Sequence, residues 1–250
     1  MRRLVGLCLA LVLGLAVSGC GSAPASSEKT VQVFAAASLT KVFTDLGAAF
    51  EKSHPGTKVV FTFDGSSGLV DQLKGGAKAD VFASADEKNM NNAVAAKLTS
   101  GEQTIFARNE LTLVVPPSNP GKITGLNDSL KGKKLVVCAP EVPCGSATNT
   151  LAQKLDVTLK PVSQESKVTD VLGKVTSGEA DAGIVYVTDA KGAGDKVETI
   201  AIEGSEQVVN NYPISVLASA PQPALAAEFV TLVTAQTGKD ALSAAGFVTP

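Results

Sequence analysis

The sequence predicts an α/β protein built of two lobes, and three observations support that prediction. Short apolar runs alternate with segments whose apolar residues recur every three to four positions, which is typical of strands followed by helices. This alternation stops at the double proline at 116–117 and then starts again. Two apolar strands, near 110–115 and 213–218, stand where the chain would cross between the two halves. A single seven-stranded sheet is the alternative.

Each half is expected to repeat the strand-helix unit. In the first half, strands are predicted at 31–34, 59–63, 80–84 and 110–115, with helices across 39–50, 69–73 and 86–98. In the second half, strands are predicted at 134–138, 182–187, 199–202 and 214–218, with helices around Leu151 and Leu155, at 168–175, and one or two within 224–245.

These elements give one lobe from 29–112 plus 216–250 and a second lobe from 113–215. A cleft between two α/β lobes is a common place for a small ligand, so we expect the ligand there.

The N-terminus is predicted to be an export signal. Two Arg precede an apolar run at 4–17, which is shorter than the roughly 20 residues that span a bilayer. The run ends in Val-Ser-Gly-Cys (17–20), which resembles a bacterial lipobox, so we expect a signal peptide at 1–19 and a lipid on Cys20. An ordinary signal peptide is the alternative. Residues 20–28 would then tether the protein to the outer face of the cytoplasmic membrane.

The expected location outside the cytoplasm determines which cysteines can form a disulfide. Cys8 leaves with the signal peptide and Cys20 is lipidated, which leaves Cys138 and Cys144 as a pair in an oxidising compartment. A disulfide between them is the default expectation, and two reduced, buried thiols are the alternative.

Charge and composition exclude several functions. Of 22 Lys and Arg, two lie in the signal peptide, so 20 basic residues face 24 acidic ones and the mature net charge is −4. That balance disfavours nucleic-acid binding. His54 is the only His, so a His-based triad or a His-rich metal site is not expected. Ser38, Ser66 and Cys144 have no evident base beside them, so the protein is not expected to be an enzyme.

Five positions are candidates for binding a ligand. Ser38 and Ser66 stand at strand-to-helix junctions, where a Ser usually caps the helix but can also form an anion site with the free N–H groups. Cys144 stands at a third junction, Val168 begins a predicted helix, and Tyr186 closes a predicted strand. Each of these three is also explained by a turn, a core valine or a packed aromatic ring.

Five segments together resemble the periplasmic molybdate-binding proteins of ABC uptake systems, and the resemblance covers nearly the whole mature chain. The lipobox and the cysteine pair resemble the actinobacterial lipoprotein branch. The segments are Val-Phe-Ala-Ala-Ala-Ser-Leu-Thr (33–40), Gly-Ser-Ser-Gly-Leu (65–69), Ala-Asp-Val-Phe-Ala-Ser-Ala-Asp (79–86), Pro-Glu-Val-Pro-Cys-Gly (140–145) and Ala-Gly-Ile-Val-Tyr-Val-Thr-Asp-Ala (182–190).

The resemblance implies a type II periplasmic-binding-protein fold and a site made only of neutral donors. Ser38 and Ser66 would give hydroxyl and N–H groups, Cys144 and Val168 backbone N–H groups, and Tyr186 its phenol. The ligand would be molybdate, and also tungstate, with molybdenum present only as the oxyanion and no direct protein–metal ligand or cofactor. Another tetrahedral oxyanion, such as sulfate or thiosulfate, is the alternative. A monomer would deliver the ligand to an ABC permease and its ATPase subunit. The sequence does not decide between molybdate and tungstate.

Overall fold

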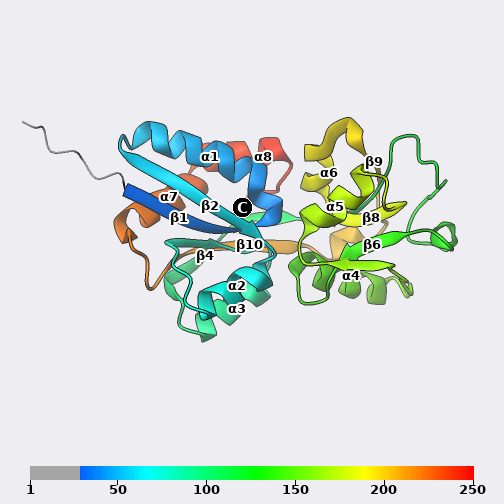
Figure 1. Ribbon diagram of the computed structural model, residues 1–250, viewed down its shortest axis with the longest axis horizontal. Coiled ribbons are helices and arrows are strands. Elements are labelled where there is room, and N and C mark those ends of the chain that lie inside the picture. The colour runs from blue at the N-terminus through cyan, green and yellow to red at the C-terminus, as the bar shows by residue number, and fades with distance from the viewer. Residues whose placement is uncertain (1–28) are drawn as a thin grey trace, which may run out of the picture.

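The computed structural model describes residues 29–250, which form two α/β lobes lying end to end (Figure 1). The signal peptide expected at 1–19, the lipidated Cys20 and the tether expected at 20–28 lie outside the described residues. Each lobe has its own five-stranded sheet and its own main apolar core. The two-lobed α/β prediction is therefore confirmed, and the single-sheet alternative is wrong.

The first sheet has the strand order β2-β1-β3-β10-β4. In it β1 pairs in parallel with β2 and β3, whereas β10 is antiparallel to β3 and β4. The strands are β1 (Lys29–Ala36), β2 (Thr57–Asp64), β3 (Val81–Ala83), β4 (Thr99–Asn109) and β10 (Asn210–Leu217). The helices are the 3-10 turn η1 (Ala37–Leu39), α1 (Thr40–Ser53), α2 (Ser66–Lys74), α3 (Glu87–Ala95), α7 (Pro223–Thr234) and α8 (Gln236–Ala245).

The second sheet has the order β7-β6-β8-β5-β9. In it β6 is parallel to β7 and β8, whereas β5 is antiparallel to β8 and β9. The strands are β5 (Leu111–Val115), β6 (Leu135–Cys138), β7 (Ser163–Glu165), β8 (Ala182–Tyr186) and β9 (Glu198–Ile200). The helices are α4 (Pro143–Lys154), α5 (Val168–Thr176) and α6 (Val187–Ala193), with 3-10 turns η2 (Asp128–Leu130), η3 (Gly194–Lys196) and η4 (Ser205–Gln207).

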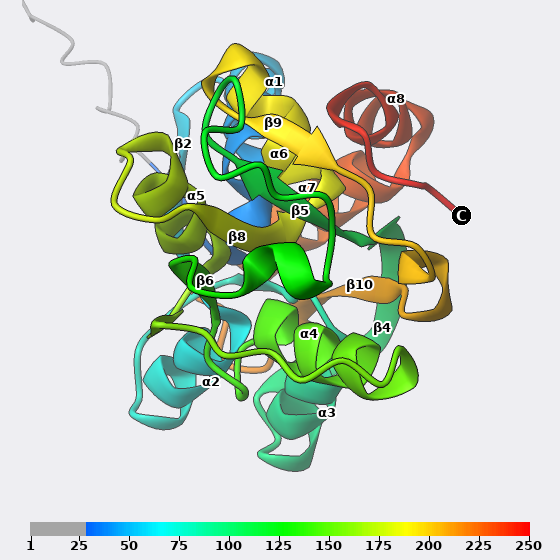
Figure 2. The same cartoon turned by 90° about the vertical axis from the view of Figure 1, so that its right-hand side faces the viewer.

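Helices cover both faces of each sheet. In both views, α2, α3 and α4 lie on one side of the sheets, and α1, α5, α6 and α8 lie on the other (Figures 1 and 2). The parallel strands β1, β2, β6, β7 and β8 each lead into a helix. This arrangement places several helix N-termini at the carboxyl ends of strands, where α/β proteins commonly bind ligands.

The chain crosses between the lobes twice. Only Glu110 separates β4 of the first sheet from β5 of the second, and 201–209 lead from β9 back to β10. Residues 210–215, which the sequence analysis placed with the second lobe, pair with β4 and β3 in the first sheet. Their register buries Tyr212 and Ile214 in the first core, although the strand begins with two polar Asn. We therefore propose lobe boundaries at Glu110 and just before Asn210.

Apolar packing explains why α7 and α8 belong to the first lobe. Phe43 of α1 lies between Phe106 of β4 and Phe229 of α7, with ring centroids 5.8 and 6.0 Å away. The second core consists mainly of Val, Leu and Ile. Ala37 of the first lobe is part of this second cluster, so the two lobes are in direct contact.

Several local predictions differ from the structure. The short strand β7 was not predicted, because its three residues are all polar. The sequence analysis missed β4, because the strand begins with the polar run Thr-Ser-Gly-Glu-Gln-Thr, most of which is exposed. Its pairing with β10 holds it in the sheet despite the weak apolar pattern. Val187, expected to end a strand, is instead the first residue of α6.

Candidate functional site

A small cavity lies between the lobes, and all five candidate ligand-binding residues line it. Its volume is about 10 Å³, far below the roughly 300–1,000 Å³ of typical organic-ligand pockets. The first lobe contributes Ser38 and Ser66, and the second contributes Cys144, Val168 and Tyr186. The other lining residues are Ala36, Ala37, Asp64, Gly65, Ala85, Val142 and Pro143. The structure thus brings together residues 148 positions apart in the chain; that they bind an anion stays a prediction.

Helix N-termini surround the cavity, and their N–H groups are left free by side chains. The N-caps of η1, α2, α4 and α5 are Ala36, Gly65, Val142 and Lys167, and none of them makes a side-chain capping hydrogen bond. The first N–H groups of a helix have no partner within the helix, and they carry a partial positive charge. Ends of this kind favour a bound anion.

Ser38 follows β1 directly and lies in the turn η1. Its Oγ is 3.0 Å from the phenol oxygen of Tyr212, a buried residue of β10. Ser38 is half-buried and lines the cavity, so a ligand can reach its hydroxyl.

Ser66 is the first residue of α2 and is fully buried. Its Oγ accepts a hydrogen bond from the backbone N–H of Ala85 at 3.0 Å. Because the oxygen accepts this bond, the hydroxyl proton of Ser66 remains available to donate into the cavity.

The second lobe presents Cys144 and Val168 through their backbones. Cys144 is the second residue of α4, and its sulfur forms a disulfide with Cys138, with the two Cα atoms 5.7 Å apart. A disulfide sulfur is not a nucleophile, so the N–H of Cys144 is the group that can act. Val168 begins α5, and its side chain packs in the second core.

Tyr186 contributes a buried, unpaired hydroxyl to the lining of the cavity in the described part of the chain. Its side chain is buried, yet among residues 29–250 its hydroxyl has no hydrogen-bond partner. Burial raises the pKa of this phenol well above its ordinary value, so the hydroxyl stays protonated and can donate. A buried polar group without a partner costs about 1–3 kcal/mol, which a ligand oxygen would offset.

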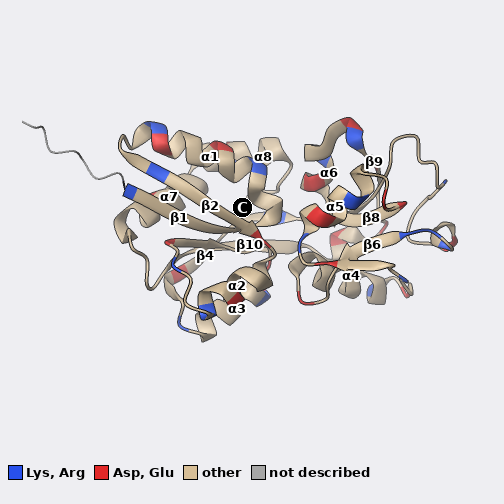
Figure 3. Ribbon diagram, in the orientation of Figure 1, with Lys and Arg blue, Asp and Glu red and all other residues tan. Residues whose placement is uncertain are grey.

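No cationic side chain lines the cavity in the described part of the chain; its one charged residue is Asp64. The sequence analysis missed this carboxylate. Its two oxygens accept hydrogen bonds from the N–H of Gly65 at 2.8 Å and from Gln72 Nε2 at 3.2 Å. These two donors compensate its charge locally at the start of α2. In the view of Figure 3, Lys and Arg are scattered over both lobes among Asp and Glu.

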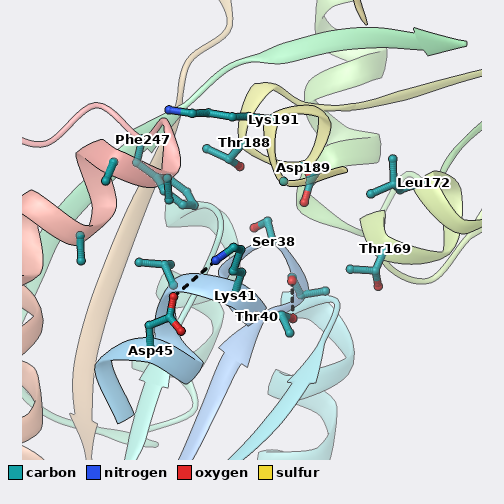
Figure 4. Close-up of a pocket in the computed structure, with 16 residues that line it drawn as sticks. Ser38, Thr40, Lys41, Asp45, Thr169, Leu172, Thr188, Asp189, Lys191 and Phe247 are labelled. Carbon is teal, nitrogen blue, oxygen red and sulfur yellow. Dashed lines mark hydrogen bonds and ion pairs between the residues drawn. The ribbon is translucent and has the colours of Figure 1, made fainter. Parts of the chain in front are cut away.

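A second, larger groove opens beside Ser38 (Figure 4). Its lining is mostly apolar, with Phe247 and several Ala. Two carboxylates also face it, Asp45, which pairs with Lys41 at 3.6 Å, and Asp189. Lys41 and Lys191 line the groove too, so its charges balance, but it has only Ser38 in common with the five candidate residues.

Asp189 lies directly behind the site. Its Oδ2 accepts the backbone N–H of Tyr186 at 3.1 Å. Burial raises the pKa of this carboxyl to about 7, although the hydrogen bond from Tyr186 acts in the opposite direction. The sequence analysis did not identify Asp189 as an unusual acid, because its burial depends on the contact of α6 with the first lobe.

Residues 29–250 lack two features that would indicate other functions. None of the helices there has both the length and the apolar character needed to cross a membrane. Within the same range, no three His, Cys, Asp or Glu side chains gather in an arrangement that could hold a metal ion.

Comparisons with known proteins point to a single family. The family model described as bacterial extracellular solute-binding protein matches residues 31–248. The molybdate-binding protein ModA of Mycobacterium tuberculosis H37Rv is 45% identical over 260 residues, covering 99% of this chain and 100% of that protein. The molybdate-binding protein ModA of Escherichia coli K12 is 37% identical over 229 residues, covering 86% and 87%.

A solved structure supports the fold. The periplasmic molybdate-binding protein of Azotobacter vinelandii superposes with a TM-score of 0.77 at 22% identity, covering 88% of this chain and 99% of that one. These relatives are binding proteins and not enzymes, in agreement with the expectation from the sequence.

Proposed function

We propose that this chain captures molybdate outside the cytoplasm for an ABC transporter. The proposal follows from its family, because the chain belongs to the bacterial extracellular solute-binding proteins. One observation carries the proposal. Neutral donors from both lobes converge on one small cavity, and the buried Tyr186 hydroxyl there has no partner in the described residues.

The donor chemistry suits a fully deprotonated oxyanion. Such an anion only accepts hydrogen bonds, and the cavity offers the hydroxyls of Ser38, Ser66 and Tyr186 beside four helix N-termini. No Lys or Arg lines it within residues 29–250, so helix ends and hydroxyls would have to replace the lost hydration of the ion.

The same chemistry suggests how the ligand is selected. Phosphate is protonated near neutral pH and needs an acceptor. The one carboxylate that lines the cavity among the described residues, Asp64, already accepts from Gly65 N–H and Gln72 Nε2, so we propose that the site disfavours phosphate. Sulfate is fully deprotonated, so only its smaller size separates it from molybdate. We propose that tungstate binds as well, because it has nearly the same size and charge as molybdate. Capture of sulfate or thiosulfate is the alternative.

The proposal extends to where the protein is anchored and to which partner it delivers its ligand. The lipobox-like residues at 17–20 support anchoring through a lipid on Cys20, and the family supports delivery to an ABC permease and its ATPase subunit. The protein would act as a monomer. Replacing Cys20 with Ala should abolish lipid labelling; normal labelling of that variant would contradict the anchoring.

Thermal melting of the mature protein with four anions tests the function. Molybdate and tungstate at 100 times their dissociation constants should each add about 2.7 kcal/mol of stability. For a chain of this size that corresponds to a rise in melting temperature of roughly 5–10 °C. Phosphate should have little effect. No shift and no calorimetric heat with either molybdate or tungstate would refute the proposal, and a shift with sulfate alone would favour the alternative.

A further inference from the structure

Tyr212 lies directly behind the proposed site without lining it. Its side chain is fully buried in β10, and its phenol oxygen is 3.0 Å from Ser38 Oγ. Either of these two oxygens could donate the proton of that hydrogen bond. Which one donates decides whether Ser38 can present its own proton to an anion.

Asn109, the last residue of β4, settles the direction. Its Oδ1 accepts the backbone N–H of Glu110 at 3.1 Å, so its Nδ2 points the other way. Nδ2 lies 2.7 Å from Thr188 Oγ1 and 3.4 Å from the Tyr212 oxygen. An amide nitrogen only donates, so the Tyr212 oxygen accepts from Asn109.

The proton of Tyr212 is then left for Ser38. Burial raises the pKa of this phenol, so it keeps its proton throughout the physiological range. Ser38 Oγ lies 3.0 Å from the phenol oxygen, whereas the Tyr186 hydroxyl, whose ring packs against Tyr212, is not within hydrogen-bonding geometry of it. Once Ser38 Oγ accepts from Tyr212, the Ser38 proton is free to point into the cavity that Ser38 lines.

We propose that Tyr212, oriented by Asn109, is a positioning residue that makes Ser38 a hydrogen-bond donor to the bound oxyanion. The inference rests on the proposed function of the cavity. It adds a source of selectivity, because a serine fixed as a donor favours anions that carry no proton. A freely rotating serine could instead accept a hydrogen bond from a protonated anion such as hydrogen phosphate.

The chain of hydrogen bonds also reaches the second lobe. Asn109 belongs to the first sheet, whereas Thr188 belongs to α6 beside the crossing at Glu110. Thr188 and Ser38 face the same groove (Figure 4). Asn109, which sets the donor direction at Ser38, therefore also contacts the second lobe.

A double-mutant cycle measured by calorimetry with molybdate tests the inference. The variants are Tyr212→Phe, Ser38→Ala and their combination. Ser215→Ala is the matched control, since it removes another buried, hydrogen-bonded hydroxyl from the same strand. Tyr212→Phe should weaken molybdate binding roughly fivefold, the equivalent of one hydrogen bond, and it should have no further effect when Ser38 is already Ala. Ser215→Ala should bind as the wild type does.

Competition with phosphate at pH 6.5 gives a second readout. The ratio of molybdate to phosphate affinity should fall in Tyr212→Phe, because Ser38 can then rotate and accept. Unchanged molybdate affinity in Tyr212→Phe, or an equal loss with and without Ser38, would overturn the inference. The failure of wild-type protein to bind molybdate would instead refute the proposed function, so the two failures are distinguishable.

Discussion

At the scale of single residues, the hydroxyl of Tyr186 distinguishes ligand affinity from the free energy of unfolding. Its hydroxyl is buried without a partner in the described residues, so the folded protein gains nothing from it before a ligand arrives. Most buried polar groups in proteins have a partner, and an exception of this kind marks a functional position. Position in the sequence alone could not reveal this, because a tyrosine that closes an apolar strand is equally well explained as a packed ring.

Tyr186→Phe should therefore affect binding and stability differently. Removing an unpaired buried hydroxyl should leave the free energy of unfolding unchanged or raise it by up to about 1 kcal/mol. Molybdate binding should weaken by about 1.5–3 kcal/mol, the range for a hydrogen bond to a charged group. Urea unfolding and calorimetry measure the two quantities. A variant that loses stability but keeps its affinity would contradict the assignment of Tyr186 as a ligand donor.

Asp189 should make the stability of the protein depend on pH. Its pKa of about 7 in the folded state lies above the ordinary value of about 3.9, so the folded protein holds this proton more tightly than the unfolded chain. Stability therefore falls as the pH rises from about 4 to about 7. Asp189→Asn keeps an oxygen that can accept from Tyr186 and removes the titration.

Urea unfolding of both proteins from about pH 3.5 to pH 8 measures this effect. The stability of Asp189→Asn relative to wild type should increase as the pH rises, by up to about 4 kcal/mol over the full titration. As a control, Asp45→Asn changes an exposed carboxylate of the neighbouring groove, which pairs with Lys41. Parallel pH curves for Asp189→Asn and wild type would show that Asp189 is ionised like an ordinary carboxyl.

At the scale of elements, the helices around the cavity leave their first N–H groups uncapped. By contrast α3 is capped by the Asp86 carboxylate, which accepts from Asn89 N at 2.8 Å, although the adjacent Ala85 lines the cavity. A missing cap costs a helix about 1 kcal/mol. The ends of α7 and α8, whose residues do not line the cavity, also lack a side-chain cap, so uncapped ends permit anion binding at the cavity without requiring it. Ser66 illustrates the point, since Gly65 occupies the N-cap and leaves the Ser66 hydroxyl for another role.

The disulfide shapes the loop that precedes α4. At Gly145 a Cβ atom would overlap the carbonyl oxygen of Ala139, so only glycine permits this close turn. The closed loop from Cys138 to Cys144 is short, so its effect on the entropy of the unfolded chain is about 2 kcal/mol. The bridge holds the Cys144 N–H in place, and its sulfur atoms are not free thiols that could react.

Cys138→Ala/Cys144→Ala should therefore melt at a lower temperature and still bind molybdate. The loss of affinity should be about 1–2 kcal/mol, because a looser loop must be ordered on binding. Scanning calorimetry with and without molybdate measures both effects. Complete loss of binding in the folded double variant would mean that the bridge itself contacts the ligand.

Patterns of apolar residues predicted most elements, and the reason for the exceptions is physical. Strands buried on both faces, such as β6 and β8, are apolar throughout and easily identified. By contrast β4 is an edge strand that is half exposed, so only its partner β10 defines it. The five candidate site residues could be named because helix junctions and the resemblance marked them. Asp64, Asp189 and Tyr212 could not, since their roles depend on contacts that only the folded chain creates.

At the scale of the whole molecule, the described structure has its lobes in contact across the site. Ala37 of the first lobe packs in the core of the second, and both lobes line the cavity. A ligand that touches both lobes binds this closed arrangement better than an open one, and only that difference in affinity can shift the population between them. The groups that let the lobes approach are therefore as important as the donors.

Gly65 is the position where this approach is tightest. Its backbone angles, φ −60° and ψ 137°, are open to any residue, so conformation does not require glycine there. A Cβ at Gly65 would, however, overlap the carbonyl oxygen of Ser166 in the second lobe. Backbone atoms yield less easily than the end of a flexible side chain, so an added methyl group would hold the lobes apart.

Gly65→Ala should fold normally and fail to close. Molybdate affinity should fall at least roughly tenfold, since the closed state is then reached only with a shift of the backbone. Small-angle X-ray scattering should show that molybdate compacts the wild type but not Gly65→Ala. Gly173→Ala is the matched control, because a Cβ there has no neighbour within 4 Å. If Gly65→Ala compacts and binds like the wild type, the contact between Gly65 and Ser166 does not limit closure, and the donors alone determine how tightly the anion is held.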